Sequence, residues 1–133
     1  MEKYIEQFYH NEYFLNKLLV DYPSEFYDWK ITVAFYTALQ LMKAYIKKKR
    51  NIDSVSHEDI KRHIINIQWR QGDCAVSESC YSAYDELRNL SEACRYFGKT
   101  KLETAEKMLI EDLEIAQKNL LLIKKYFLKH KII

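Results

Sequence analysis

The chain contains very little glycine and proline, and this limits its fold class. Its 133 residues include 2 Gly and 1 Pro. A sandwich or barrel of many short strands needs frequent turns, and these two residues supply most of them. The composition therefore excludes such folds and predicts an all-α protein. A chain of this length suits one domain, residues 1–133, whose core folds without disulfides or metal.

Cysteines and long apolar runs are also scarce. Cys74, Cys80 and Cys94 form no Cys-x-x-Cys pair, and no His lies at zinc-finger spacing from them. The odd number predicts free thiols in a reducing cytoplasm, with no metal site and no cofactor. No uncharged apolar run reaches about 18 residues, and the first residues lack the basic and apolar parts of a signal peptide. We therefore expect neither a membrane span nor secretion.

The two charge signs nearly balance, with 21 Lys plus Arg against 19 Asp plus Glu, so net charge gives no argument for nucleic acid. Two local clusters are more informative. The first is Lys47, Lys48, Lys49 and Arg50, and the second is Lys124, Lys125, Lys129, His130 and Lys131. If the helices that carry them run parallel, the clusters add to one track for a phosphate backbone. Otherwise each is only a favourable charge at a helix C-terminus.

Apolar spacing predicts two long helices in the first half of the chain. The first begins near Tyr4 and ends near Asp21, before the break at Tyr22-Pro23-Ser24. The second begins between Ser24 and Asp28 and reaches about Lys49. Its apolar side chains cover most of its circumference, so we expect it in the middle of a bundle.

A polar connection, residues 50–55, leads to a short third helix. Ser56 followed by Asp59 resembles a helix N-cap with an acidic residue in the first turn. This pattern predicts a helix over about residues 57–69. Residues 71–73 then form a loop.

Two further helices complete the predicted fold. Apolar positions mark a fourth helix from Tyr81 to Phe97, which Gly98 should terminate. Thr100 to Glu103 matches a capping box at the start of the last helix. The apolar stripe of that helix is long enough to pack against two helices or to form a dimer seam. The sequence thus predicts an antiparallel up-and-down bundle of four to five helices.

Several motifs between about residues 28 and 97 occur in the order seen in one superfamily. They are Asp28-Trp29, Ala34-Phe35-Tyr36-Thr37-Ala38-Leu39, Ser56-His57, Tyr84, Leu87, Leu90-Ser91, Ala93 and Arg95-Tyr96. In these motifs the chain resembles the HEPN superfamily of small, often dimeric helical bundles. The resemblance implies a HEPN-like bundle. Many members are metal-independent endoribonucleases of toxin–antitoxin, phage-defence and RNA-processing systems, whereas others are inactive binding or regulatory modules.

Active HEPN members carry an Arg, usually followed by a polar residue, and then a His after four to six residues. Arg50, Asn51 and His57 match this pattern with six intervening residues. The resemblance implies that His57 takes the proton of a 2′-hydroxyl, that Arg50 stabilises the phosphate and that Asn51 orients one of them. In HEPN nucleases two such pairs meet across a dimer, so a monomer would be inactive.

Each of these residues also has a purely structural interpretation. His57 follows a helix N-cap and could sit exposed beside Glu58, and Arg50 is favourable at a helix C-terminus. Arg62 and His63 either extend an RNA-binding surface with Lys47, Lys48 and Lys49 or form an exposed, solvated face.

Two further positions bear on the resemblance. We expect Arg95 to bond a carboxylate, Glu86 or Asp85, rather than a ligand. Asp59 stands where HEPN toxins silenced by adenylylation have a Tyr. This departure counts against that subfamily.

The leading expectation is an RNA-directed cytoplasmic homodimer. Its most concrete form is a metal-independent endoribonuclease of toxin or defence type, with an antitoxin or a nucleotidyltransferase-like protein as partner. One alternative is a catalytically inactive HEPN-like module that binds a nucleotide or a partner protein. Another is a structural homodimer built on the last helix.

Overall fold

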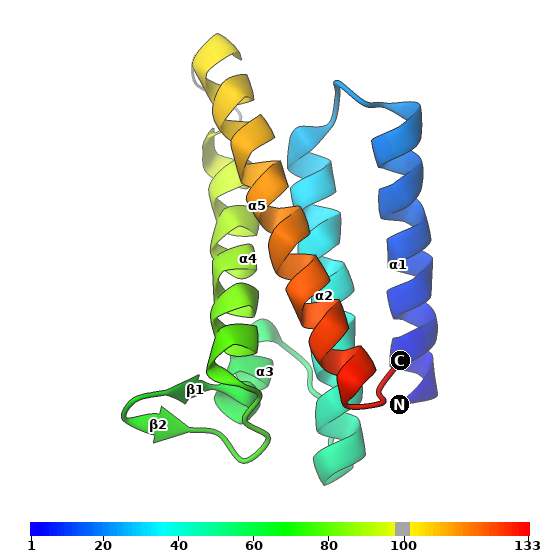
Figure 1. The fold of residues 1–133 in the computed structure, drawn as a ribbon, viewed down its shortest axis with the longest axis vertical. Helices are drawn as coiled ribbons and strands as arrows, with labels where there is room; N and C mark the ends of the chain where they lie inside the picture. The colour runs from blue at the N-terminus through cyan, green and yellow to red at the C-terminus, as the bar shows by residue number, and fades with distance from the viewer. Residues whose placement is uncertain (98–101) are drawn as a thin grey trace.

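Four long helices form the bundle, and a short helix and a hairpin lie at one end of it (Figure 1). The computed structural model describes the backbone of residues 1–97 and 102–133 and the side chains of residues 1–94 and 107–133. The elements are α1 (Glu2–Asp21), α2 (Tyr27–Arg50), α3 (His57–Ile64), β1 (Asn66–Ile67), β2 (Arg70–Gln71), α4 (Glu78–Phe97) and α5 (Leu102–Lys129). The predicted all-α bundle is confirmed, with the hairpin as a small addition.

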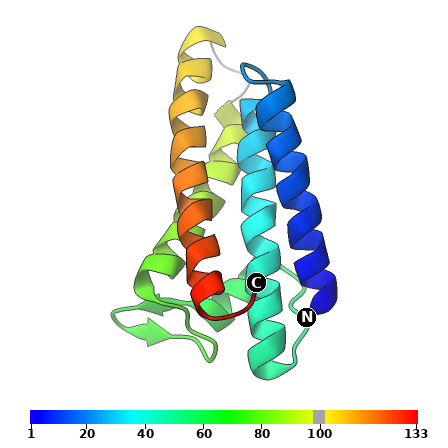
Figure 2. The ribbon, with the colours of Figure 1, turned by 45° about the vertical axis from the view of Figure 1, so that its right-hand side comes forward.

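Helix α2 occupies the centre of the bundle. It contacts α1, α3, α4 and α5, as its nearly continuous apolar surface predicts. Its fully buried side chains include Ile31, Leu41, Met42 and Ile46. Helices α1 and α4 run in one direction and α2 and α5 in the other, so α2 and α5 are parallel (Figures 1 and 2).

The end of α2 is fixed by Asn51. This residue adopts a left-handed conformation, φ 56° and ψ 38°, and its N–H donates to the carbonyl of Lys47 at 2.9 Å. Asparagine tolerates this conformation better than most residues and commonly ends helices in this way. The predicted end near Lys49 is therefore correct to within one residue, and Asn51 has a clear structural role.

The third helix is shorter than predicted. Ser56 caps it as expected, because its Oγ accepts a hydrogen bond from the Asp59 N–H at 3.1 Å. The expectation that the helix continues to Trp69 is wrong, because α3 ends at Ile64 and an antiparallel hairpin pairs Asn66 with Gln71. The hairpin strands are too short, and too mixed in residue type, to give a strand pattern in the sequence.

The loop after the hairpin returns onto the end of α3. The Cys74 N–H donates to the His63 carbonyl at 2.8 Å, and the Val76 N–H donates to the Ile64 carbonyl at 3.2 Å. Gly72 permits this close approach, since a Cβ there would lie 2.2 Å from the His63 oxygen. These hydrogen bonds satisfy carbonyl groups that the end of a helix leaves without partners.

Helix α4 begins earlier than predicted, at Glu78, because Ser77 Oγ accepts from the Cys80 N–H at 3.2 Å and caps it. The predicted stop at Gly98 and the capping box at Thr100 involve residues outside the described part of the chain. On α5 the predicted stripe faces the core. Its buried members are Leu113, Ala116, Leu120, Ile123 and Phe127.

This stripe packs against α2 and α4 of the same chain. Of the two roles predicted for it, packing within the bundle is confirmed and the dimer seam is wrong. The three cysteines are free, as expected, and all three are buried; Cys74 lies in the loop after β2. Among the described helices, none has the length and hydropathy needed to cross a membrane.

Replacing Gly72 tests the loop contact. We expect Gly72→Ala to lower the free energy of unfolding by about 1–3 kcal/mol, because the added methyl group meets a backbone carbonyl that cannot turn aside. Urea unfolding followed by circular dichroism measures this change. Gln68→Ala, at an exposed hairpin position, is the control and should leave stability nearly unchanged. Equal stability of Gly72→Ala and the wild type would contradict the contact.

Candidate functional site

A groove runs along one face of α2. This face carries Tyr36, Gln40 and Lys43, which are spaced four and three residues apart. Three neighbouring pockets of about 320, 530 and 330 Å³ line this face, and Gln40 lines all three. We call the combined feature the α2 groove. Because helical residues at this spacing share a face, the groove follows the side of α2 that its neighbours cover least.

His57 lines one end of the α2 groove. Its Nδ1 lies 3.0 Å from the Tyr84 hydroxyl, and its ring centroid lies 5.8 Å from that of Phe35. Burial, and then the positive charge of Arg88, lower the pKa of the His57 imidazole below its usual value. The expectation of an exposed His57 beside Glu58 is therefore wrong, since the imidazole is half-buried. A neutral imidazole is able to accept a proton near pH 7.

Arg88 and Lys43 are the cations of the same pocket. The Arg88 side chain is 21% exposed and forms an ion pair with Glu92 one turn further along α4. Neither residue belongs to a motif predicted from the sequence. The sequence feature that could have predicted Arg88 is its spacing from Tyr84, because residues four apart share a face of a helix.

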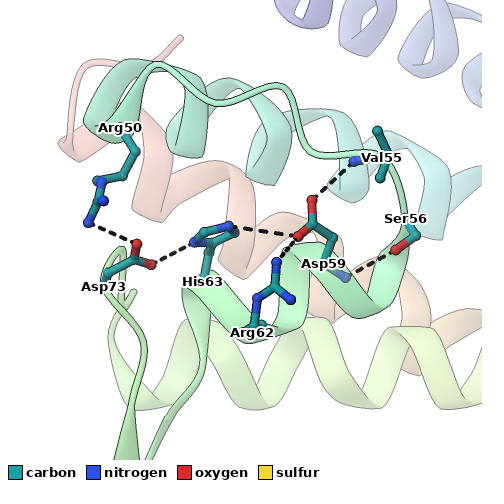
Figure 3. A network of polar contacts seen from close by, with 7 residues as sticks. All are labelled: Arg50, Val55, Ser56, Asp59, Arg62, His63 and Asp73. Carbon is teal, nitrogen blue, oxygen red and sulfur yellow. Dashed lines mark hydrogen bonds and ion pairs between the residues drawn. The ribbon is translucent and has the colours of Figure 1, made fainter.

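Arg50 belongs to a different cluster, shown in Figure 3. Its Nη1 lies 2.9 Å from Asp73 Oδ2, and the other carboxylate oxygen of Asp73 lies 2.7 Å from His63 Nδ1. Asp59 on α3 is also part of the cluster. Its carboxylate forms an ion pair with Arg62 and accepts a 3.3 Å hydrogen bond from the Val55 N–H. We call this cluster the α3 polar network.

The α3 polar network corrects one expectation. His63 is 9% exposed and lies inside the structure, so its placement on an exposed, RNA-binding face with Arg62 is wrong. Arg62 itself is exposed, as expected. The hydrogen bond with His63 and the charges of His63 and Arg50 lower the pKa of the Asp73 carboxyl.

Within the described part of one chain, Arg50 and His57 contact different side chains. His57 faces Tyr84 and Phe35, whereas Arg50 faces Asp73. His57 and His63 are six residues apart on α3 and so point to different sides of that helix. Arg50 and His57 thus do not form a joint contact within one chain, and a site at which their pairs meet across a dimer stays a prediction.

The basic clusters lie at one end of the bundle, because α2 and α5 are parallel (Figure 1). The condition for a combined track is thus met. Three of its cations are already paired with carboxylates, namely Lys47 with Asp53, Arg50 with Asp73 and Lys124 with Glu12. The exposed lysines of the two clusters are Lys48, Lys49, Lys125, Lys129 and Lys131, and Arg50 and His130 are exposed as well.

The predicted bond of Arg95 involves a side chain outside the described residues. Both of its candidate partners have other contacts. Asp85 lies 3.9 Å from Lys61, and Glu86 accepts a hydrogen bond from Asn119 at 2.8 Å.

We find no family model, curated protein or solved structure that matches this chain. The HEPN resemblance therefore continues to depend on the sequence motifs given above.

Asp53 fixes the chain segment that lies between Arg50 and His57. Its carboxylate accepts a 2.6 Å hydrogen bond from the Tyr4 hydroxyl and a 3.1 Å hydrogen bond from Lys47. These two bonds lower the pKa of Asp53 to about 2. The start of α1 is thereby joined to the chain that leads into α3.

We expect a pH-dependent contribution of Asp53 to stability. Its pKa is lower in the folded state, about 2 against 3.8, so the contribution is complete above pH 3.8 and is lost as the pH falls toward 2. Asp53→Asn should therefore melt at a lower temperature than the wild type at pH 6, with the difference shrinking between pH 4 and 2. Asp21→Asn, exposed at the end of α1, is the control. A difference independent of pH would contradict this assignment.

The environment of His57 is tested by an NMR titration. In the wild type the His57 imidazole should titrate below pH 6.5, and Arg88→Gln should raise its pKa part of the way back, since burial is the larger cause. Lys61→Gln, which removes a weaker positive influence, is the matched control and should raise the pKa less. An unchanged pKa in Arg88→Gln would show that the guanidinium does not act on the ring.

Proposed function

We propose that this chain is an RNA-directed protein and, most concretely, a metal-independent endoribonuclease. The observation that supports this best is that the imidazole of His57, with its lowered pKa, lines the same pocket as the cations Arg88 and Lys43. A base beside positive charge is what cleavage by an internal 2′-hydroxyl requires. The HEPN-like motifs and the lysine-rich end of the bundle support the same class of substrate.

The chemistry places His57 as the general base. In this role Nδ1–H donates to the Tyr84 hydroxyl oxygen, which leaves Nε2 unprotonated and able to accept a proton. It removes the 2′-hydroxyl proton, the oxygen attacks the adjacent phosphorus, and the bond from phosphorus to the 5′-oxygen breaks. The products are a 2′,3′-cyclic phosphate and a 5′-hydroxyl, whose proton comes from solvent or from the protonated imidazole. Arg88 stabilises the negative charge on the phosphate oxygens.

Arg50 and Asn51 enter this proposal from a second chain. The resemblance implies a cytoplasmic homodimer with a shared site, and an antitoxin or a nucleotidyltransferase-like protein as regulatory partner. Exposed apolar residues on α5 support a further surface for self-association, since Met108, Ile115 and Leu122 repeat every seven residues along one face. In such a dimer, Arg50 of one chain would complete the pocket that holds His57 of the other.

Cleavage of mixed RNA in the presence of EDTA tests the proposal. We expect His57→Ala to reduce the rate by about 10²–10⁴-fold, and Arg88→Gln by about 10²–10³-fold, because they remove the base and the main cation of the pocket. His10→Ala changes an exposed imidazole on α1 and is the control, with no expected effect. Equal cleavage by the wild type and His57→Ala would remove the assignment.

Mixing two inactive variants identifies the contribution of Arg50. If the site is shared, Arg50→Gln alone should be slow, and a mixture of Arg50→Gln with His57→Ala should regain part of the activity through mixed dimers that contain one intact site. Arg50→Gln with wild-type activity would assign the cation role to Arg88 alone. Gel filtration of each variant checks that the oligomeric state is unchanged.

A second candidate is an inactive HEPN-like module that binds a nucleotide or a partner protein. It is favoured by the ion pair that occupies Arg50 with Asp73, 2.9 Å apart. A rise in melting temperature with a nucleotide, without RNA cleavage in EDTA, would support this function instead.

A further inference from the structure

The end of α3 and the loop after β2 bring three metal-ligand side chains together. The ligand atoms of His63, Asp73 and Cys74 all lie within 4.8 Å of one another. His63 and Cys74 are 9% and 3% exposed, and Asp73 lies at the surface beside them. The three are not used by the pocket of His57.

The backbone holds this trio in place independently of the side chains. The Cys74 N–H donates to the carbonyl of His63 itself, at 2.8 Å, and the Gly72 N–H donates to the Ile65 carbonyl at 2.7 Å. The residues are therefore fixed by a short, tightly bonded return of the chain. Ligands fixed in this way lose little conformational entropy when an ion binds.

Two charged side chains lie beside the trio. Figure 3 shows Asp59 on the far side of the His63 ring from Asp73, with its carboxylate 3.8 Å from Nε2. At this distance the Asp59 carboxylate acts on Nε2 as a nearby negative charge, and Nδ1 is the nitrogen that faces Asp73 and would bind an ion. Arg50 lies against Oδ2 of Asp73, which leaves Oδ1 toward His63.

We propose that His63, Asp73 and Cys74 form a zinc-binding site. One nitrogen, one carboxylate oxygen and one sulfur suit Zn²⁺, whereas Mg²⁺ and Ca²⁺ prefer oxygen alone. Two bonds to the ion replace the 2.7 Å hydrogen bond between His63 and Asp73. Cys74 binds as the thiolate, so its proton passes to solvent, and water completes the fourth position. The site ties the hairpin to α3 and goes beyond the proposed RNA cleavage.

Cobalt is the probe for this site, because Co²⁺ takes the coordination of Zn²⁺ and absorbs visible light. The protein of 133 residues is stripped of metal with a chelator, dialysed and titrated with Co²⁺. We expect one equivalent to give d–d bands together with a thiolate charge-transfer band, and Zn²⁺ to displace both. Absence of bands at one equivalent, or bands without the thiolate component, would overturn the proposal.

Matched variants decide which residues bind. Cys74→Ser should remove the thiolate band, and Asp73→Asn should weaken Co²⁺ binding by more than about tenfold. Cys80→Ser, which changes an equally buried thiol on α4, and His130→Gln, at an exposed imidazole, should bind as the wild type does. Loss of the band in Cys80→Ser with retention in Cys74→Ser would overturn the assignment.

Hydrogen exchange gives a readout that does not depend on RNA cleavage or on the Cys74 variant folding. In the wild type, one equivalent of Zn²⁺ should slow exchange of the Gly72, Cys74 and Val76 amides, since the ion holds the loop against α3. Asp73→Asn, which changes a surface side chain, should show no such protection. Equal protection in both proteins would place the ion elsewhere. Failure of the zinc site leaves the cleavage test in EDTA unaffected, so the two proposals fail separately.

Discussion

The burial of α2 on nearly all sides is the constraint on which the rest of the structure depends. Ile31, Leu41 and Met42 are fully buried, and the adjacent residues Leu41 and Met42 lie about 100° apart around the helix, so it is buried on more than one side. A helix of this kind is stable only inside a bundle, so it fixes the positions of α1, α4 and α5 around it. The stripe of Tyr36, Gln40 and Lys43 breaks the apolar surface, and the α2 groove forms there.

Much of the fold follows from local sequence signals. The period of apolar residues gives the long helices, the break at Pro23 separates the first two, and Ser56 marks the start of α3 because its hydroxyl caps the helix. The central position of α2 follows from the same pattern. Two of its aromatic residues, Trp29 at 59% and Tyr36 at 42% exposed, lie at the surface, which periodicity does not distinguish from the interior.

The remainder depends on contacts between distant segments. The chain leaves α3 at Ile64 because amides of Cys74 and Val76, some ten residues later, bond the last carbonyls of the helix. His63 is buried by the same return of the chain, although its helix position alone indicates an exposed face. A search for Cys-x-x-Cys spacing also misses Cys74, because its companions are an imidazole and a carboxylate supplied by the fold.

The candidate site is likewise predicted only in part from local sequence. His57 is found from its place after an N-cap and from the HEPN-like motifs, but the cation that lowers its pKa most, Arg88, comes from α4, 31 positions later by number. Arg50 is near His57 in sequence, and yet its side chain pairs with the carboxylate of Asp73. Asn51, in a left-handed conformation, ends α2 and redirects the chain between the two residues. Sequence distance is therefore a poor guide to which charges act on an imidazole.

The parallel course of α2 and α5 has a consequence for the exposed lysines at their common end. Each helix carries a partial negative pole at its carboxyl end, and Lys48 and Lys129 lie in the last turns of these two helices, beside those poles. The amino ends of α1 and α4 lie at the same end of the bundle, and their positive poles offset the negative ones for a ligand at a distance. The lysines therefore act on their own helix ends at short range, and removing them would cost the two helices stability as well as weaken the attraction of a polyanion.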